Sequence, residues 1–495
     1  DLRTKVFNKV VNFSDAEINK FSTASLITRT TNDVQQVQMV TVMLLRMVLY
    51  APIMAVGGII MVIRTGAGMG YIIAIAVVAI AVLMILLMAF AMPKFKIMQK
   101  LVDKVNLVSR EILTGIPVIR AFSREKHEEK RFDDANKELT GVMLYTNRVM
   151  TFMMPALMII MNVMSILIVW TSAHRIDAGV MEVGTMTAFI TYTMMIVMAF
   201  LMLTMISIML PRAGVAADRI DEVLKTEVSV NNSTDAVDAG RSKGVVRFNH
   251  VSFAYPEAEG KVLDDIDFEA SPGTTTAIIG STGCGKSTLV NLIPRFFDVT
   301  EGSITLDGRD IRNITLESLR ENIGYVPQKG ILFSGTIADN IKYGQLVESD
   351  EDMLEAAEIA QATEFIEAKP DKYESQVAQG GNNVSGGQKQ RLSIARAIAR
   401  DPMIYIFDDS FSALDFKTDA ALRKALAPKV KDKTVLIVAQ RISTVMHAEQ
   451  IIVLDDGKVA GIGTHKELME NCEIYRQIAG SQLSESELKK SLEVK

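Results

Sequence analysis

The chain has 495 residues and a formal charge of −5 at pH 7, and 49% of its residues are hydrophobic while 22% are charged. This composition excludes a disordered chain and provides material for several domains. The two cysteines, Cys284 and Cys472, are too few for a disulfide framework or a four-ligand zinc site, which fits a reducing cytosol.

Four stretches in the first half are long and apolar enough to cross a membrane. They are residues 41–63, 71–92, 149–170 and 186–210, with 23, 22, 22 and 25 residues. At about 1.5 Å per residue, each exceeds the roughly 30 Å of a hydrocarbon core. The only formal charge within them is Arg46. Four buried helices of a soluble core are disfavoured because the stretches have no polar face. We therefore predict a multi-pass membrane domain.

The segments between these stretches alternate in length. Residues 93–148 form a long connection with twelve Lys or Arg and eight Asp or Glu, so the positive-inside rule places this connection in the cytoplasm. Thr114-Gly115-Ile116-Pro117 lies near its middle, where glycine and proline are expected to break a helix. Two helical arms of about 25 residues, roughly 40 Å long, would carry this break to a tip that can touch a soluble domain.

The second half of the chain has the pattern of a soluble domain. Residues 226–243 are polar, as expected of a linker between a membrane domain at 1–225 and a second domain at 244–480. Beyond the linker, short β-branched runs alternate with helical stretches, which predicts an α/β fold. A tail at 481–495 is expected to form an exposed polar helix or a frayed end. The expected strands are VVRFNHVSFAY, TTTAIIG, SITLDG, NIGYVP, MIYIFDD, TVLIVAQ and QIIVLDDG.

The strongest motif is a glycine-rich loop that follows one of these strands. It reads Gly280-Ser281-Thr282-Gly283-Cys284-Gly285-Lys286-Ser287-Thr288. Glycines allow backbone amides to close around phosphate oxygens, Lys286 can reach the β and γ phosphates of ATP, and Ser287 can bind Mg²⁺. A chance glycine-rich turn is the alternative, which the strand before the loop and the helix after it disfavour.

A second motif is an apolar strand, Met403-Ile404-Tyr405-Ile406-Phe407, that ends in Asp408. Its carboxylate can hold the same Mg²⁺ through water. Many core strands end in aspartate, so this motif indicates a Mg²⁺ site only in combination with the phosphate loop.

Between these two motifs, Asn383-Val384-Ser385-Gly386-Gly387-Gln388-Lys389-Gln390-Arg391 precedes an Ala- and Ile-rich helix. A serine and two glycines at the start of a helix can bind an anion. An ordinary serine N-cap satisfies the helix equally well, and the motif alone does not separate the two.

The order of these motifs resembles the ATP-binding cassette (ABC) of ABC transporters. Tyr325-Val326-Pro327-Gln328 and Ser412-Ala413-Leu414-Asp415 complete the pattern. The resemblance implies that Tyr255 stacks on adenine, unless it is only a core tyrosine, and that Gln328 senses Mg²⁺ and couples the site to the spans. Ser385, Gly386, Gly387 and Gln388 would cap an ATP held by the opposite subunit, because such cassettes work in head-to-tail pairs.

The membrane half resembles that of multidrug-type exporters, whose six spans precede the cassette. This resemblance implies a partial transmembrane domain, in which the four stretches correspond to the third to sixth spans and two spans are absent. The chain, which starts at Asp1, is therefore interpreted as a fragment. Residues near 16–23 and 113–118 correspond to coupling helices that press on the cassettes.

Two residues depart from the family pattern at the expected catalytic positions. Asp409 follows Asp408 where the family has a glutamate that polarises the attacking water, and Gln440 stands in place of a histidine near the γ phosphate. Aspartate is one methylene shorter, and a misplacement of about 1 Å can cost roughly 100-fold in rate. Glutamine has no titratable nitrogen. Gln379 is a milder departure, and in the signature only Val384 replaces the usual leucine.

These departures lead to the hypothesis of a heterodimer. This chain would bind Mg-ATP at a degenerate site and lend its signature to the hydrolytic site of a non-identical half-transporter that carries the glutamate and the histidine. A homodimer that hydrolyses ATP slowly is the alternative.

The expected function is ATP-driven export of hydrophobic compounds across a membrane, here a bacterial cell membrane with the cassette in the cytoplasm. Of 29 methionines, 25 lie in the membrane half, and flexible methionines could line a cavity for varied apolar molecules or could simply pack helices or face lipid. A lipid or peptide exporter is the second possibility and an ATP-gated regulator or channel the third. An importer is disfavoured because its spans and cassettes usually lie on separate chains. The acidic balance and the absence of a basic aromatic stripe exclude nucleic-acid binding.

Overall fold

A computed structural model of the protein describes residues 1–65, 68–256, 258–484, 486–488 and 491. The described chain divides into two compact units. Thr28–Glu222 forms one unit, and Asp1–Ile27 together with Val223–Lys495 forms the other. The residues that we predicted as one membrane domain, 1–225, therefore contribute to both units.

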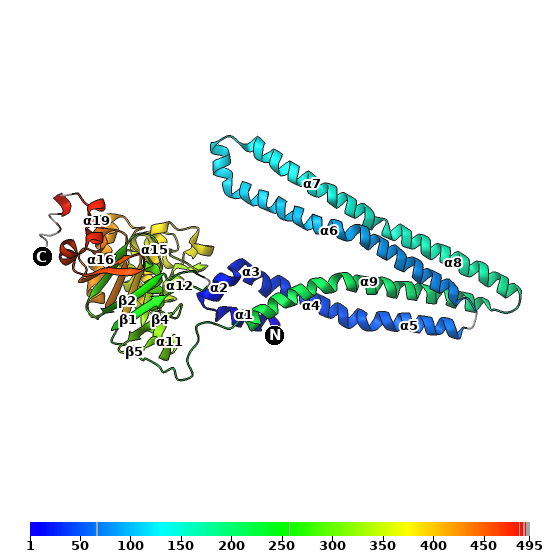
Figure 1. Ribbon diagram of the computed structural model, residues 1–495, viewed down its shortest axis with the longest axis horizontal. Coiled ribbons are helices and arrows are strands. Elements are labelled where there is room, and N and C mark those ends of the chain that lie inside the picture. The colour runs from blue at the N-terminus through cyan, green and yellow to red at the C-terminus, as the bar shows by residue number, and fades with distance from the viewer. Residues whose placement is uncertain (66–67, 257, 485, 489–490, 492–495) are drawn as a thin grey trace. The chain divides into compact units, whose positions relative to one another are not determined.

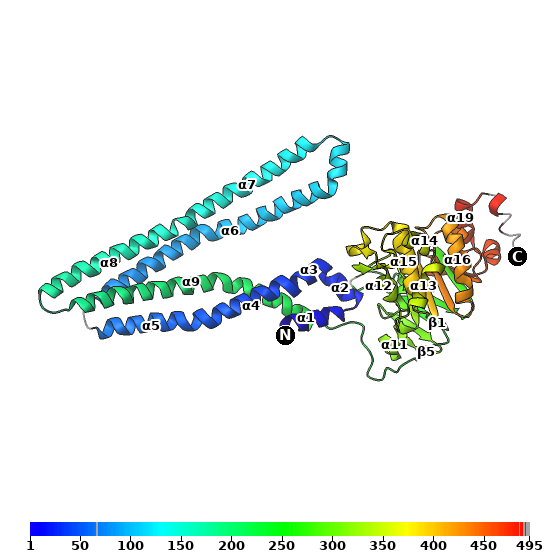
Figure 2. The ribbon, with the colours of Figure 1, turned by 180° about the vertical axis from the view of Figure 1, so that it is seen from behind.

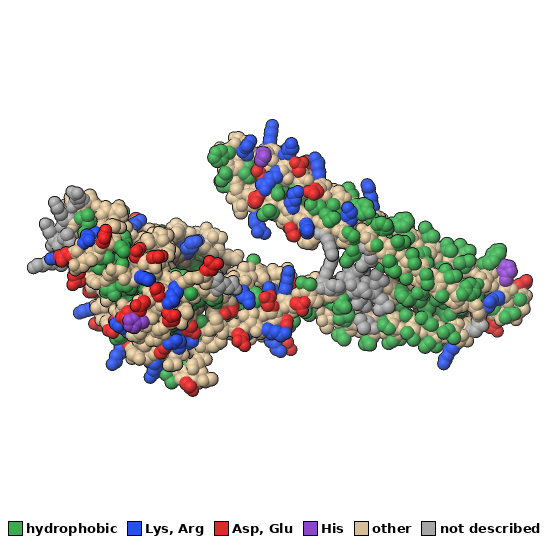
Figure 3. Space-filling view, in the orientation of Figure 1, with side chains coloured by type: hydrophobic (Ala, Val, Ile, Leu, Met, Phe, Trp, Pro, Cys, Tyr) green, Lys and Arg blue, Asp and Glu red, His purple; other side chains and the backbone are tan. Residues whose placement is uncertain are grey.

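The first unit is built from long helices (Figure 1). Its helices are α4 (Val34–Met43), α5 (Leu49–Arg64), α6 (Gly70–Ala121), α7 (Glu125–Thr151), α8 (Met153–Asp177) and α9 (Val183–Lys225), the last of which continues into the second unit. Among the described residues, four helical stretches are long and apolar enough to cross a membrane, and they contain the four predicted spans or, for the fourth, most of it. Figure 3 shows hydrophobic side chains covering the outer face of these helices, while charged side chains gather at the end formed by α6 and α7.

The predicted helix break at Thr114–Pro117 is wrong. α6 continues through Gly115 and Pro117 to Ala121, and the chain reverses at Phe122–Arg124 instead. Local propensity does not decide the end of this helix, because α6 packs against α7, to which the ion pair between Glu111 and Arg131 also joins it. Figure 1 shows the consequence as a bend near the end of α6 rather than an interruption.

The second unit contains an α/β domain with two main sheets. A six-stranded sheet has the order β12-β11-β3-β10-β9-β6 and is parallel except for β12, while a four-stranded antiparallel sheet has the order β2-β1-β4-β5. A short pair, β7 and β8, lies apart from both. The strands are β1 (Val246–Phe253), β2 (Leu263–Ala270), β3 (Thr275–Gly280), β4 (Glu301–Leu306), β5 (Arg309–Asp310), β6 (Ile323–Val326), β7 (Gly335–Thr336), β8 (Gln376–Val377), β9 (Ile404–Asp408), β10 (Thr434–Val438), β11 (Gln450–Asp455) and β12 (Lys458–Gly463).

The five parallel strands of this sheet are buried on both faces, which explains why they read as continuous apolar runs, whereas the edge strand β12 is partly exposed. In β3, Ala277 and Ile279 point into a core with α12, α13, α15 and α16, which Figure 2 shows together on one side of the domain. Ile278 points to the opposite core, shared with the antiparallel sheet and α10. The helices are α1 (Leu2–Val11), α2 (Asp15–Phe21), α3 (Thr23–Thr28), α10 (Lys286–Leu292), α11 (Leu316–Glu321), α12 (Ile337–Lys342), α13 (Asp350–Ile359), α14 (Thr363–Glu367), α15 (Gly386–Ala399), α16 (Phe416–Val430), α17 (Ile442–Val445), α18 (His465–Asn471) and α19 (Glu473–Gln482).

The seven predicted strands correspond to β1, β3, β4, β6, β9, β10 and β11. The prediction missed β2, whose LDDIDFEA sequence is rich in acids, and β12, which contains two glycines. The residues predicted as a linker, 226–243, contain no helix or named strand. The predicted tail, 481–495, lies partly outside the described residues.

A buried histidine holds the C-terminal helices together. The Nδ1 atom of His465 lies 2.7 Å from the Tyr475 hydroxyl, and its Nε2 atom lies 2.9 Å from the Ser491 hydroxyl. His465 is 6% exposed, and burial, helped by nearby His447, lowers the pKa of its imidazole.

This environment predicts a pH-dependent stability. The folded state resists protonation of His465, whereas the unfolded chain accepts a proton below about pH 6.5, so stability should fall by up to about 1.4 kcal/mol per pH unit below that value. Thermal unfolding of the detergent-solubilised protein at pH 7.5 and pH 5.5 measures the effect. His465→Gln should reduce the difference between the two melting temperatures, whereas His127→Gln, at an exposed position, should not. An equal difference in wild type and His465→Gln would contradict this assignment.

Candidate nucleotide-binding site

The glycine-rich loop between β3 and α10 has a backbone that only glycine tolerates at several points. Gly283 and Gly285 have φ values of +87° and +96°, in the left-handed region. A Cβ atom on Gly280 would lie 2.1 Å from the carbonyl oxygen of Leu454, so a side chain there would collide with β11. A loop of this kind leading into a helix binds phosphate through its backbone amides.

Lys286 places a positive charge inside this loop. Its Nζ atom donates hydrogen bonds to the carbonyl oxygens of Gly280, at 2.9 Å, and Ser281, at 2.6 Å. The residue is 8% exposed, and in the described part of the chain it forms no ion pair. A buried ammonium group with mainly neutral partners fits the binding of an anion such as a phosphate group.

Ser287 and Asp408 lie together, as predicted for a shared Mg²⁺ site. The Ser287 hydroxyl donates to Oδ1 of Asp408 at 3.0 Å, and Asp408 is 3% exposed at the end of β9. Burial raises the pKa of Asp408, although the Ser287 hydrogen bond and the charge of Lys286 lower it. Hydroxyl and carboxylate oxygens are the ligands that Mg²⁺ prefers. When bound, the ion would neutralise charge on the ATP phosphates.

Tyr255 lies beside the phosphate loop. Its hydroxyl is 2.9 Å from the Thr288 hydroxyl, which connects it to α10. Its ring contacts Phe253 and Phe297 edge to face, with centroid distances of 4.9 Å and 5.2 Å. Tyr255 is thus partly a core residue and partly available next to the nucleotide site.

Three polar side chains meet after the ends of β6, β9 and β10. Oδ2 of Asp409 accepts a hydrogen bond from Nε2 of Gln440 at 3.0 Å, and Nε2 of Gln328 lies 3.5 Å from the same oxygen. Asp409 has a φ of +45°, and its amide donates to the carbonyl oxygen of Val438 at 3.0 Å. Burial raises the pKa of Asp409 above its usual range, while the Gln328 and Ser412 hydrogen bonds and nearby positive charges lower it.

The signature residues form a capping box at the start of α15. The Ser385 hydroxyl accepts from the amide of Gln388 at 3.3 Å, and the Gln388 side chain accepts from the amide of Ser385 at 3.0 Å. In the described part of the protein, no hydrogen bond links these residues to the phosphate loop of the same chain. The site residues predicted from the sequence therefore form two groups in this chain. One surrounds the phosphate loop and the ends of β6, β9 and β10, and the other is the signature at the start of α15.

The sequence analysis gave no role to Gln390, which connects these groups. Gln390 is 2% exposed, and its Nε2 atom donates to the carbonyl oxygen of Pro327, next to Gln328, at 3.2 Å. A glutamine four positions before the buried Ile394 of the same helix was the available signal, because i and i+4 share a helix face.

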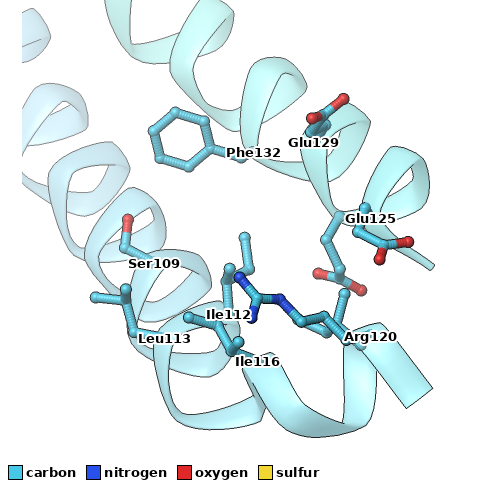
Figure 4. A pocket seen from close by; sticks show the side chains of 10 residues that line it. Ser109, Ile112, Leu113, Ile116, Arg120, Glu125, Glu129 and Phe132 are labelled. Atoms are coloured by element: carbon cyan, nitrogen blue, oxygen red, sulfur yellow. The ribbon is translucent and has the colours of Figure 1, made fainter. Parts of the chain in front are cut away.

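The two regions predicted as coupling helices lie in different units. Residues 16–23 include most of α2, and Ala16 packs against the core of the ATP-binding domain. Residues 113–118 lie near the end of α6, where a cavity of about 460 Å³ opens between α6 and α7. Figure 4 shows Leu113, Ile112 and Phe132 around its apolar part, and Arg120, Glu125 and Glu129 at its edge.

Comparison with known proteins identifies both units. Residues 1–200 match the ABC transporter transmembrane region, and residues 263–412 match the ABC transporter family. An uncharacterized ABC transporter ATP-binding protein of Mycobacterium tuberculosis is 44% identical over 491 residues, which cover 97% of this chain and 83% of the relative. YfiB of Bacillus subtilis, also named as an uncharacterized ABC transporter ATP-binding protein, is 40% identical, with 97% and 83% covered.

Two further similarities concern export. A Bacillus subtilis protein, YgaD, provisionally named as a multidrug export ATP-binding/permease protein, is 37% identical over 74% of this chain and 63% of its own. The solved structure of a bacterial Atm1-family ABC exporter with ATP bound has a TM-score of 0.79 and 26% identity, and the match covers 98% of this chain and 85% of that one.

The close approach of Gly280 to β11 predicts that replacing Gly280 by alanine affects both the stability of the protein and its binding of ATP. Gly280→Ala should destabilise the protein by about 1–3 kcal/mol and abolish binding of ATP, because the Leu454 backbone cannot move without separating β3 from β11. Thermal unfolding and binding of a fluorescent ATP analogue measure the two effects. Gly480→Ala is the control, since no atom lies within 4 Å of the added carbon, and it should leave ATP binding unchanged and not lower stability, because alanine is favoured within α19.

Proposed function

This chain belongs to the ABC exporter family as a half-transporter, in which a transmembrane region is joined to an ATP-binding domain, and we propose that it forms one half of a heterodimer that exports hydrophobic compounds. In this proposal its own phosphate loop binds Mg-ATP but hydrolyses it poorly. Its signature completes the hydrolytic site of a non-identical partner. Tyr255, the 280–288 loop, Gln328 and Asp408 hold the nucleotide and its metal ion.

The observation that carries the proposal is the hydrogen bond between Gln440 and Asp409. A general base must accept a proton from the attacking water, and its carboxylate must reach that water. The Asp409 side chain is one methylene shorter than glutamate, and one of its oxygens already accepts a hydrogen bond from Gln440 at 3.0 Å. The amide of Gln440 can donate to a phosphate or to Asp409, but it cannot titrate as histidine does.

The signature supports the second part of the proposal. Ser385 caps α15 through its side chain, and a helix start of this kind can donate amides to a phosphate anion. Because the signature forms no hydrogen bond to the phosphate loop within the part of the chain that the structure describes, we propose that Ser385, Gly386, Gly387 and Gln388 act on the ATP of the partner subunit. This arrangement makes each nucleotide site depend on both subunits.

The proposed substrate class rests on the apolar character of the helical unit and on the multidrug export names of several relatives. In the sequence of the four apolar stretches, 41–63, 71–92, 149–170 and 186–210, the residues are mostly apolar, many of them methionine, and there is no acidic residue that could bind a cation. The proposed location is a bacterial cell membrane, with the ATP-binding domain on the cytoplasmic side.

Restoring the family residues tests the degenerate site. The double variant Asp409→Glu, Gln440→His should raise the ATPase rate of this chain by about 100-fold, since both the reach of the base and the histidine return. Steady-state phosphate release by the purified chain measures the rate, and the same double variant with Lys286→Ala is the control for contaminating ATPases. An unchanged rate would mean that Asp409 and Gln440 do not limit hydrolysis.

Unequal roles of the two sites give a second prediction. In a complex with a half-transporter that has glutamate and histidine at these positions, Ser385→Arg should reduce ATP hydrolysis by about 100-fold, because it removes anion-binding groups from the active site. Lys286→Ala should reduce hydrolysis much less. Equal losses of ATP hydrolysis in the two variants would favour a homodimer instead. Full ATP turnover by the wild-type chain without the partner would also favour a homodimer, one that is active by itself.

A further inference from the structure

A single buried carboxylate connects α2 to the linker that precedes the ATP-binding domain. Glu17 is 6% exposed. Its Oε2 atom accepts hydrogen bonds from the Ser14 amide, at 2.8 Å, and the Ser14 hydroxyl, at 2.5 Å. Its Oε1 atom accepts from the amide of Ser229 at 3.1 Å. The hydroxyls of Ser14 and Ser229 also lie 2.7 Å apart.

The two carboxylate oxygens have different partners. The bonds to Ser14 form the capping box of α2 and need no other part of the chain. The bond to Ser229 joins residues 212 positions apart, and the start of α2 is complete without it. Burial by itself would raise the pKa of Glu17, but hydrogen bonds from Ser14 and Ser229 lower it below its usual value, so the group is charged at neutral pH. A charged acceptor makes each of these bonds stronger.

The same face of α2 reaches the nucleotide site. A cavity of about 640 Å³ is bounded by Ala16 and Asn19 of α2, by Ser229 of the linker, and by Tyr255 and Phe297 of the ATP-binding domain. Tyr255 in turn contacts Thr288 of the phosphate loop through its hydroxyl, at 2.9 Å. Ala16 and Tyr255 both pack against the same hydrophobic core. α2 and Tyr255 are therefore connected through the core on which both pack and border the same cavity, and Tyr255 is in turn hydrogen-bonded to Thr288 of the phosphate loop.

We propose that Glu17 is a positioning residue that fixes the linker to α2, so that ATP bound against Tyr255 restrains α2 and the linker together. The proposal rests on the proposed function, since it needs a nucleotide at Tyr255. Without the bond from Glu17 to Ser229, ATP still binds, but α2 no longer responds to it. The response would otherwise pass from α2 to the helices that follow.

Hydrogen–deuterium exchange of the full-length protein in lipid nanodiscs tests this role, with and without Mg-ATP. In wild type we expect slow exchange at the Ser229 amide and a further decrease over residues 15–21 when Mg-ATP is added. In Ser229→Pro, which removes the linker amide but leaves the capping box, and in Glu17→Gln, the ATP-dependent decrease should be lost. In Glu17→Gln, the Ser229 amide should exchange roughly tenfold faster, as expected for the loss of one hydrogen bond.

Two controls separate positioning from folding and binding. Asn19→Ala, on the same helix and the same cavity, should retain the wild-type response. Binding of a fluorescent ATP analogue should stay within about threefold of wild type in all variants, because none of them changes the phosphate loop. Ser229→Ala retains the amide and should retain the response, which distinguishes the amide bond from the hydroxyl contact.

Each outcome decides between the proposals. If the analogue binds to wild type and residues 15–21 show no change, or if Ser229→Pro responds as wild type does, the role of Glu17 is wrong while the ATP site stands. If the analogue does not bind to wild type, the proposed function fails and this inference fails with it.

Discussion

The parallel pairing of β3, β10 and β9 is the constraint on which the nucleotide site depends. Ile278 pairs with Val438, and Val438 pairs with Asp408, so three strands distant in sequence end at the same edge of the sheet. The phosphate loop, the acidic pair and Gln440 follow these three ends. Parallel strands need both faces of the sheet covered, and the two cores that cover them hold the register. The positions of the functional side chains at this edge are therefore set by packing within the two cores, away from the site itself.

This constraint also explains how residues at the site can differ from the family pattern without disturbing the fold. Asp409 and Gln440 follow strands that are fully buried, and their own side chains face the site rather than either core. The Asp409 carboxylate accepts a hydrogen bond from the Gln440 side chain of the same chain. The same edge still holds Ser287 hydrogen-bonded to Asp408, with the charge of Lys286 close enough to lower the pKa of Asp408. In the proposed function, nucleotide binding and hydrolysis would depend on different residues of one sheet edge, so a sequence change could weaken hydrolysis while binding is retained.

The sequence predicted what is encoded locally and missed what depends on distant contacts. The phosphate loop, the acidic strand and the signature could be identified because each is a short run with its own backbone requirement. The pairing of Asp409 with Gln440 and the bond from Glu17 to Ser229 could not, since the partners lie 31 and 212 residues apart. The expected break at Gly115 and Pro117 was wrong because local propensity was taken to decide the helix end, whereas packing of α6 against α7 carries the helix through. The acid-rich β2 was missed because aspartate and glutamate are disfavoured in strands, and its pairing with β1 overrides that preference.

The length of α6 has a mechanical consequence. Its 52 residues form one helix of roughly 78 Å, longer than twice the thickness of the hydrocarbon layer. A rod of this kind resists shortening, so a push on its outer end becomes a tilt or a translation along the whole length. A displacement of the turn at Phe122–Arg124 would therefore be carried along α6 to its apolar part, apart from what the bend near its end absorbs.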